Sequence, residues 1–422
     1  MKVVLRNQDK NLLFRILFHL FLFTAAVFSL FFPWRTMGAE NTSNLQKRLS
    51  ALETRWGHLQ IGGDLSLSAE YFNSLYNKPQ SMSLAENSHL FLDAQVDQNF
   101  SLYLLLAQES TFGSTNIPFY LDEVALRYRT PQFLGDLGRF RFTLDPLGLI
   151  ADHSTVPVEG LAFQTGGHSW YLGGYYARQL SSYFLNDGAN FTFGPSGTNT
   201  LRSDDEIALR LAFTKSKYMG GITVSSLNNE ASRIADQEAR KIDANVEISP
   251  ESINSVAVDL GLELQGGNLQ AEAAWYPQFD RDGEQTGSSV GWLLSWAKPL
   301  PNSAGFTAKA WSFPETFSPY YSVIGASNNN ENLMIGNSRG LIGEYQKNLA
   351  KGWDLRTQTG IIYLNNETPL SSDSPDLVFS GRLIKSFSTL TSLEMGFDWG
   401  FQPIDSGEAR YSRFIIKTTT LF

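Results

Sequence analysis

The chain has 422 residues, of which only 18% are charged, a net charge of −9 and no cysteine. The absence of cysteine excludes disulfides, thiolate metal sites, cysteine nucleophiles and a lipoprotein anchor. An acidic chain without a basic tract is also a poor candidate for binding nucleic acid.

The first 39 residues have the order of a secretory signal peptide. A basic stretch, residues 1–15, precedes an apolar run at residues 16–32, and Ala39 offers a cleavage site. The site is imperfect because Met37 is bulky where a small residue is preferred. Since the apolar run approaches the length that spans a bilayer, an uncleaved inner-membrane anchor is the alternative. We expect residues 1–39 to be a signal peptide.

Residues 40–57 predict a short amphipathic helix, the one helical stretch expected after the signal. Its apolar residues recur at spacings of four, three and four: Leu45, Leu49, Leu52 and Trp56. The helix either lies on the mouth of the domain that follows or forms a small periplasmic coiled coil that joins protomers. It is too short to hold a coiled coil alone, so both interpretations stay open.

From residue 58 onward the apolar residues recur at every second position, which is the period of a β-strand. A representative segment places Ile207, Leu209, Leu211 and Phe213 on one face and Glu206, Arg210 and Thr214 on the other. About eighteen such segments follow one another, most near the length of about ten residues of a tilted transmembrane strand. The last one ends on the aromatic Phe422 and resembles the closing strand of bacterial outer-membrane barrels, which the insertion machinery recognises.

The connections between these segments alternate in length. Short turns at residues 97–99 and 265–267 contrast with long polar stretches at residues 73–88, 179–203, 227–253, 314–333 and 364–375. Short turns on one side and long loops on the other are typical of outer-membrane barrels. The sequence therefore predicts an all-β fold, a transmembrane antiparallel β-barrel of roughly 16–18 strands over residues 58–422, preceded by a short periplasmic helix.

A soluble β-sandwich is the competing fold, because its strands alternate in the same way. A single hydrophobic core could not bury the apolar faces of this many strands. A single sheet of this size therefore needs an apolar medium, such as lipid, on its outer side. Aromatic residues such as Tyr71, Trp275 and Trp399 stand near the ends of the apolar faces, which suits an interfacial girdle. These features favour the membrane barrel.

Charged residues gather in the predicted hairpin at residues 119–144. Glu123, Arg127 and Arg129 are expected to point inward from its first strand, and Arg139 and Arg141 from its second. Phe140, Phe142 and Leu144 are then expected to face lipid. If the hairpin is symmetric about Leu134, Arg127 lies opposite Arg141, Arg129 opposite Arg139, and Glu123 opposite Asp145.

Two interpretations of these arginines stay open. The functional hypothesis is a basic stripe on the pore wall that guides anionic or polar solutes, as rings of charged side chains do in channels. The structural alternative is that the arginines pair with carboxylates of the lumen and fill space. Acidic residues are plentiful on the inward faces, so strong anion selectivity does not follow.

The connection at residues 145–158 is apolar, unlike the other long connections, and counts as the third external loop. We expect it to fold inward and narrow the pore, because apolar side chains avoid water. Its surroundings resemble the pattern in bacterial porins in which a strand ending in Gly-Arg leads to the constriction loop: Asp122 to Tyr128, Gly138-Arg139-Phe140, Gly148-Leu149, Asp152 and Glu159-Gly160. The resemblance implies that Asp145, Asp152 and His153 lie near the narrowest point of a channel.

Enzymatic signals are weak. Asp152 and His153 beside Asp145 could bind a metal, but such a pair in a loop is more often simply solvated. His168 and Ser169 lack the glycines of a nucleophile elbow, and no phosphate-cradling glycine pattern occurs. We expect neither enzymatic activity nor a cofactor or metal.

The function that fits these patterns is a porin of the bacterial outer membrane, a channel through which small hydrophilic solutes or ions diffuse passively. Its partners would be these solutes and outer-membrane lipid, and the resemblance implies a homotrimer. The first alternative is a structural anchor whose N-terminal helix binds a periplasmic partner, and the second is a barrel enzyme.

Overall fold

A computed structural model of the chain describes residues 59–74, 81–111, 119–154, 157–180, 203–314, 338–364, 376–404 and 407–422. The signal peptide and the amphipathic helix expected at residues 1–57 lie outside the described residues. Within residues 60–422, which form one compact unit, the described part is almost entirely β-sheet.

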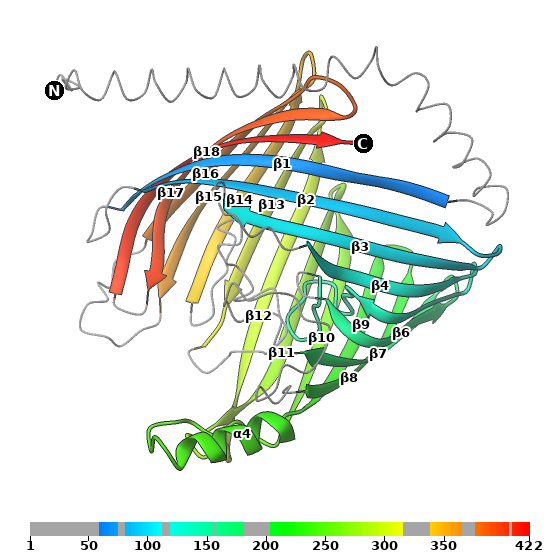
Figure 1. Cartoon of the computed structure of the whole chain (residues 1–422), viewed down its shortest axis with the longest axis vertical. Helices are drawn as coiled ribbons and strands as arrows, with labels where there is room; N and C mark the ends of the chain where they lie inside the picture. Colours follow the sequence, from blue (N-terminus) through cyan, green and yellow to red (C-terminus); the bar gives the residue numbers. More distant parts are fainter. Residues whose placement is uncertain are drawn as a thin grey trace. The chain divides into compact units, whose positions relative to one another are not determined.

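Eighteen antiparallel strands form one sheet that closes on itself (Figure 1), in agreement with the expected fold and strand number. The strands are β1 (Leu59–Ser74), β2 (Ser81–Gln95), β3 (Phe100–Thr111), β4 (Phe119–Arg129), β5 (Phe133–Phe140), β6 (Val158–Gly166), β7 (Trp170–Leu180), β8 (Ser203–Lys215), β9 (Tyr218–Asn228), β10 (Ser252–Leu264), β11 (Gly267–Phe279), β12 (Gln285–Leu300), β13 (Ala304–Ser312), β14 (Ser338–Leu349), β15 (Trp353–Leu364), β16 (Asp376–Ser386), β17 (Thr391–Ile404) and β18 (Gly407–Leu421). Each strand pairs with the next one in the sequence, and β18 pairs with β1.

The seam between the first and last strands is a regular antiparallel ladder. Leu421 lies opposite Asp64 and Tyr411 lies opposite Ser74. Beyond the ladder, the backbones of Gly63 and Phe422 exchange two hydrogen bonds of 3.0 and 3.1 Å. The final strand therefore closes the barrel, as the terminal aromatic pattern predicts.

The two faces of the wall differ as the alternation predicts. On β8 the apolar side chains point outward, where Phe213 keeps 59% of its surface exposed, whereas Glu206 and Arg210 on the inner face are buried. The same alternation holds on β10, with Val258 outside and Asp259 inside. An exposed apolar outer face around a polar interior is the arrangement of a barrel that spans a membrane.

Short turns join the strands at one end and longer connections at the other, as predicted, except that only residues 405–406 separate β17 from β18 at the second end. One connection is shorter than expected. Instead of residues 73–88, it covers only residues 75–80, because the polar residues that follow already belong to β2. Polar side chains are compatible with a strand here, since one face of each strand looks into the interior.

A helix in a connection was not predicted. The long connection between β9 and β10 contains α4 (Glu230–Arg240), so the expectation of a single helix near the N-terminus was wrong. Its first backbone N–H, that of Glu230, bonds to the Asn228 side chain, and Arg240 stands in its last turn, where a cation favours the helix dipole. Among the described residues no helix is long and apolar enough to cross a membrane.

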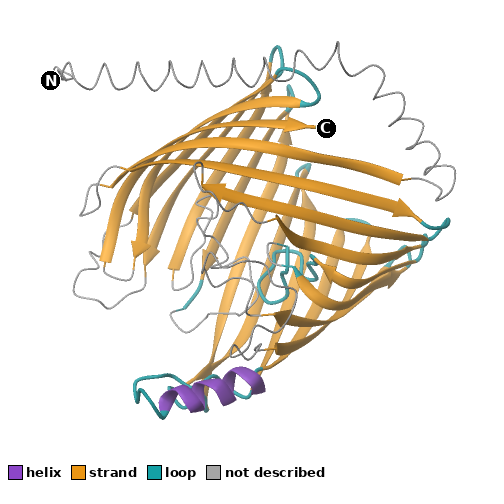
Figure 2. Ribbon diagram, viewed as in Figure 1, coloured by secondary structure: helices purple, strands orange, loops and turns teal. Residues whose placement is uncertain are grey.

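The connection between β5 and β6, residues 141–157, folds into the barrel and is called the constriction segment below. Its apolar residues Leu149, Ile150 and Ala151 are buried in one hydrophobic cluster with inner-face residues of the wall such as Ala208 and Ala274. Figure 2 shows this segment as a teal coil enclosed by the strands. The predicted inward folding of the third external loop is confirmed.

Phe140, Phe142 and Leu144 were expected to face lipid, and this expectation was wrong. Phe140 and Leu144 are buried in the same inner cluster, and Phe142 packs against it. The hairpin turns at residues 130–133 rather than around Leu134, because Pro131 favours a tight turn there and Thr130 closes it with a backbone bond to Phe133. An odd shift of register moves every side chain of a strand to its other face.

Candidate functional site

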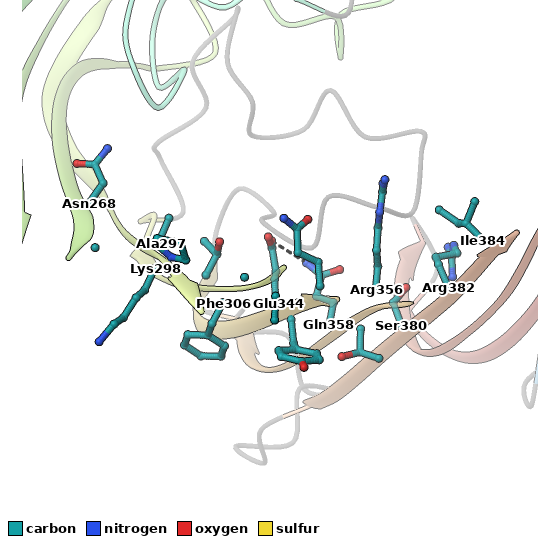
Figure 3. Close-up of a pocket in the computed structure, with 18 of the residues that line it drawn as sticks. Asn268, Ala297, Lys298, Phe306, Glu344, Arg356, Gln358, Ser380, Arg382 and Ile384 are labelled. Atoms are coloured by element: carbon teal, nitrogen blue, oxygen red, sulfur yellow. Dashed lines mark hydrogen bonds between the residues drawn. The ribbon is translucent and has the colours of Figure 1, made fainter. Parts of the chain in front are cut away.

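The inner wall carries a cavity of about 750 Å³ that extends from the ends of β10 to β12 across β13 to β17 (Figure 3). Its polar side chains on β14 to β17 include acids, arginines, an amide and a hydroxyl: Glu344, Arg356, Gln358, Ser380, Arg382 and Glu394. They come from neighbouring strands, and the register places Glu344 opposite Gln358 and Arg356 opposite Arg382. A hydrophilic solute inside the barrel therefore meets acidic, basic and amide groups within one cavity.

Glu344 is held at the centre of this cavity by two neighbours. The Nζ atom of Lys309 donates to its Oε1 atom at 2.8 Å, and Nε2 of Gln358 donates to the same oxygen at 3.3 Å. All three side chains are only partly buried, so the group stays accessible from the lumen. This acid is therefore partly neutralised and held in a fixed position.

Arg356 and Arg382 face each other across β15 and β16 but have different surroundings. Arg382 is buried and makes a two-pronged contact with Asp398, with N–O distances of 2.5 and 2.9 Å. Arg356 is exposed, and no salt bridge joins it to another described residue. Figure 3 shows it extending from the strands on the same side as Glu344. Arg356 is thus a positive charge open to solutes, whereas Arg382 is part of the wall.

Asp398 is the centre of a buried ionic network next to the cavity. Besides Arg382 it accepts hydrogen bonds from Nε of Arg413 at 3.0 Å and from Oγ of Ser380 at 2.8 Å. Arg382 also lies 3.2 Å from Glu394. These charge-assisted bonds to one carboxylate hold β16, β17 and β18 in fixed positions relative to each other next to the cavity.

The arginines of the β4–β5 hairpin are paired with carboxylates rather than stacked against each other. Arg129 lies 2.6 Å from Asp136, and Arg127 lies 3.6 Å from Glu123 and 3.8 Å from Asp136. Arg127 also stacks on the ring of Tyr103, 3.7 Å from its centroid. For Arg127 and Arg129 the interpretation as paired side chains is therefore the one that the contacts support.

The expected register of this hairpin was wrong. Arg127 lies opposite Asp136 and not Arg141, and Arg129 lies opposite Leu134 and not Arg139. Arg139 is instead in register with Val124 and Glu159, and it is buried. The turn at Pro131 sets this register, which removes the opposed arginine pairs.

Arg141 connects the start of the constriction segment to β4. Its guanidinium donates to Asp122 at 2.6 and 2.9 Å and to Glu123 at 2.7 Å. Burial acts to lower the pKa of Arg141, but the hydrogen bonds and charges of these two carboxylates outweigh it, so the pKa is raised. Glu123, expected opposite Asp145, binds this arginine instead.

The other predicted site residues of the constriction segment fix its shape. Asp145 is buried and accepts the backbone N–H groups of Ile150 and Ala151 at 2.9 and 3.0 Å. Asp152 accepts the Thr143 hydroxyl at 2.8 Å. Asp145 and His153 thus face the wall rather than the open lumen, whereas Asp152 is partly exposed.

Two carboxylates of the wall hold this segment in place. Oε2 of Glu206 on β8 lies 2.9 Å from Nε2 of His153, and Oε2 of Glu272 on β11 accepts the backbone N–H of Leu147 at 2.9 Å. Within the described part of the chain no group of three or more acidic or histidine side chains could hold a metal ion. His153 anchors the loop to β8 through Glu206, whereas the contacts of Asp152 with Thr143 and Ser154 lie within the loop.

Sequence reasoning placed Glu206 on an inward face, and the same alternation places Arg356, Gln358 and Glu272 inward, but none of the four was identified as a site residue. The alternation of each strand carries that signal, since an acid such as Glu272 stands between apolar outward residues. Their meeting with the constriction segment or the cavity could not be seen, because it depends on register and on the path of a loop.

Three-dimensional comparison finds the same barrel in solved structures. OccK11 (OpdR) of Pseudomonas aeruginosa is 12% identical, with 86% of this chain and 96% of that chain covered and a TM-score of 0.57. The outer membrane protein OpdK of the same organism is 12% identical over 86% and 99%, with a TM-score of 0.55. OccAB4 of Acinetobacter baumannii is 12% identical over 86% and 98%, with a TM-score of 0.51. No protein-family model and no curated protein sequence matches the chain. At this level of identity the likeness shows a shared fold.

Proposed function

We propose that this chain is an outer-membrane porin that forms a water-filled channel for passive diffusion of small hydrophilic solutes. The observation that carries the proposal is the division of one closed sheet into an apolar outer face and an inner face with accessible charges such as Glu344 and Arg356. Charged groups that point into a barrel need water there, and barrels of about 16–18 strands are wide enough to hold an aqueous channel.

The constriction segment supports passage of small solutes rather than large ones. It fills the interior along β7 to β11, where Leu144 contacts Gly173 and Glu272 binds Leu147. The cavity with Arg356 and Glu344 lies mainly on another part of the wall, β13 to β17, and reaches the ends of β10 to β12. Solutes would therefore pass between an apolar insert, which narrows the lumen, and a wall with fixed polar groups. These groups favour hydrophilic solutes because they offer hydrogen bonds in exchange for water.

Planar-bilayer recording of the purified, folded protein tests the proposal. We expect steady conductance steps that decrease when neutral sugars of increasing size enter the lumen. A heat-denatured sample of the same preparation is the control for conductance caused by detergent. A folded barrel that inserts into the bilayer without any conductance would overturn the channel and favour a structural anchor. The homotrimer stays a prediction that chemical crosslinking in detergent can test.

A further inference from the structure

The contact between the constriction segment and the wall buries more acids than bases. Asp145, Glu206 and Glu272 are each at most 2% exposed, and Asp259 is buried beside them. Arg210 is the cation of the wall at this contact, and it binds Asp259 at 2.5 and 3.0 Å. That pair is neutral as a unit, so Arg210 leaves the three remaining carboxyl groups unbalanced. Isolated buried carboxylates are costly, which means that other positive charge or protons must be present.

The elements around this contact supply few other charges. The titratable or charged groups on the segment and on the strands that face it are Arg141, Asp145, Asp152 and His153 on the segment, Asp122 and Glu123 on β4, Arg139 on β5, Tyr171, Tyr175 and Arg178 on β7, Glu206 and Arg210 on β8, Asp259 on β10, and Glu272 and Tyr276 on β11. Arg141 is engaged by Asp122 and Glu123, Arg178 is exposed and binds Asp205, and Arg139 is in register with Glu159 on β6. This leaves His153 as the base in direct contact with one of the unbalanced acids.

Glu272 shows where one proton is needed. Its Oε2 atom accepts the N–H of Leu147, but its buried Oε1 atom has no hydrogen-bond partner among the described residues. The acids that act on it electrostatically are Asp145 and Asp259. A proton on Oε1 of Glu272 would remove one charge and turn the bare oxygen into a donor. Burial and neighbouring carboxylates both favour the protonated form of a carboxyl group.

His153 and Glu206 form a second contact between the segment and the wall. Glu206 accepts the hydroxyl of Ser225 at 2.6 Å and lies 2.9 Å from Nε2 of His153. The imidazole packs edge-on against the ring of Tyr175, with 5.1 Å between ring centroids. Glu206 therefore has partners for both of its oxygens, whereas Glu272 keeps one bare oxygen.

We propose that the constriction segment is held against the wall through a protonated Glu272, so that pH controls the width of the channel. Glu206 and Glu272 are then positioning residues, which act on solutes only through the segment. Measuring this effect as a change in conductance depends on the proposed channel function. The docking of the segment itself does not depend on it.

The sign follows from comparing the docked and released segment. In water a carboxyl group loses its proton near pH 4, as an approximate ordinary value. Above this value the released state binds fewer protons than the docked state, so rising pH favours release. Each proton lost on release changes the ratio of docked to released segment by up to about tenfold per pH unit.

Single-channel conductance recorded between about pH 5 and about pH 9 tests this inference. We expect wild-type conductance, or the frequency of a larger open state, to rise with pH. Glu272→Gln should flatten the rise because the neutral amide replaces the protonated carboxyl group and does not change its charge with pH. Asp64→Asn, in the His89–Asp64 pair at 3.1 Å elsewhere on the wall, is the matched control and keeps the wild-type profile. A flat wild-type profile, or an unchanged rise in Glu272→Gln, would overturn the proposal.

Thiol labelling gives a readout that needs no conductance, and the chain has no native cysteine to interfere. Ala151→Cys reports docking because Ala151 is fully buried, and Ser154→Cys on the exposed part of the same segment corrects for thiol ionisation. We expect the ratio of their labelling rates with a charged thiosulfonate to rise roughly tenfold between pH 6 and pH 8. A constant ratio in the folded barrel contradicts docking by protons. A rising ratio without conductance would instead contradict only the channel.

Discussion

Arg356 and Arg382 lie directly opposite each other on β15 and β16, yet Arg382 is enclosed by Asp398 and Glu394 whereas Arg356 is exposed. Two like charges at neighbouring positions repel each other unless one of them is neutralised by an acid. The network around Asp398 does this for Arg382, which leaves Arg356 as the charge that solutes meet. This difference gives opposite expectations for the two arginines.

Arg356→Gln should shift the channel toward cations. A unit charge about 10 Å from the path of an ion contributes about 0.4 kcal/mol in water, with opposite sign for cations and anions, so the ratio of cation to anion permeability should rise up to about fourfold at low salt. Reversal potentials in a salt gradient measure this ratio. Arg356→Lys, which keeps the charge, is the control and should leave it unchanged. An identical reversal potential in Arg356→Gln would show that this side chain lies away from the path.

Asp398→Asn should destabilise the barrel rather than change its selectivity. Removing one partner of a buried, hydrogen-bonded ion pair typically costs about 3–5 kcal/mol, because the remaining charges lose their compensation. Urea unfolding of the protein in lipid or detergent micelles measures the loss. Lys241→Ala breaks the exposed pair with Glu238 on α4 and should change stability by less than about 0.5 kcal/mol. Equal unfolding midpoints for both variants would contradict a structural role of Asp398.

The pairing of Arg141 with Asp122 should appear as an energetic coupling. A double-mutant cycle of Arg141→Gln and Asp122→Asn should give an interaction energy of about 1–3 kcal/mol, because the two groups share hydrogen bonds and partial burial. Unfolding free energies of the two single variants and the double variant supply the cycle. The loss of unfolding free energy in the double variant should therefore differ from the sum of the losses in the two single variants. Additivity within about 0.3 kcal/mol would return Arg141 to the hypothesis of a basic stripe that acts on solutes.

Gly63 should be intolerant of a side chain. An added Cβ atom would lie 2.3 Å from the carbonyl oxygen of His89 and 2.7 Å from the Phe422 ring, so Gly63→Ala forces the seam apart. The fraction of protein that folds into lipid vesicles, seen as heat-modifiable mobility in gels, should fall. Gly305→Ala is the control because its added Cβ would meet only the flexible side chain of Gln346. Equal folding yields would show that the seam can adjust at Gly63.

The sequence was sufficient to predict which residues face inward on a strand but not which residues meet across strands. Ile207 and Leu209 indicate the outer face of β8, and therefore the inner position of Glu206, without knowledge of any other strand. The partner of Arg127 depends instead on where the hairpin turns, and the turn at Pro131 made it Asp136. The helix α4 was missed because its apolar positions are mostly alanines, with Ile234 as the one large apolar side chain to mark them.

The cavity shows the same limit. The alternation along β15 places Arg356 and Gln358 inside, whereas the contact between Gln358 and Glu344 joins two strands through their register. The anchoring acids Glu206 and Glu272 lie 53 and 125 residues from their partners in the constriction segment. Contacts at such separations are set by closure of the sheet, for which a local pattern holds no information.

Ala208, Ala257 and Ala274 give the wall below the constriction segment an inner surface of small apolar groups. The apolar residues of the constriction segment pack on this surface. Because the segment is held by apolar packing and a few hydrogen bonds, its sequence can be replaced without changing the strands of the barrel. The aperture of this protein is therefore open to redesign through one loop, with the strands kept as a fixed frame.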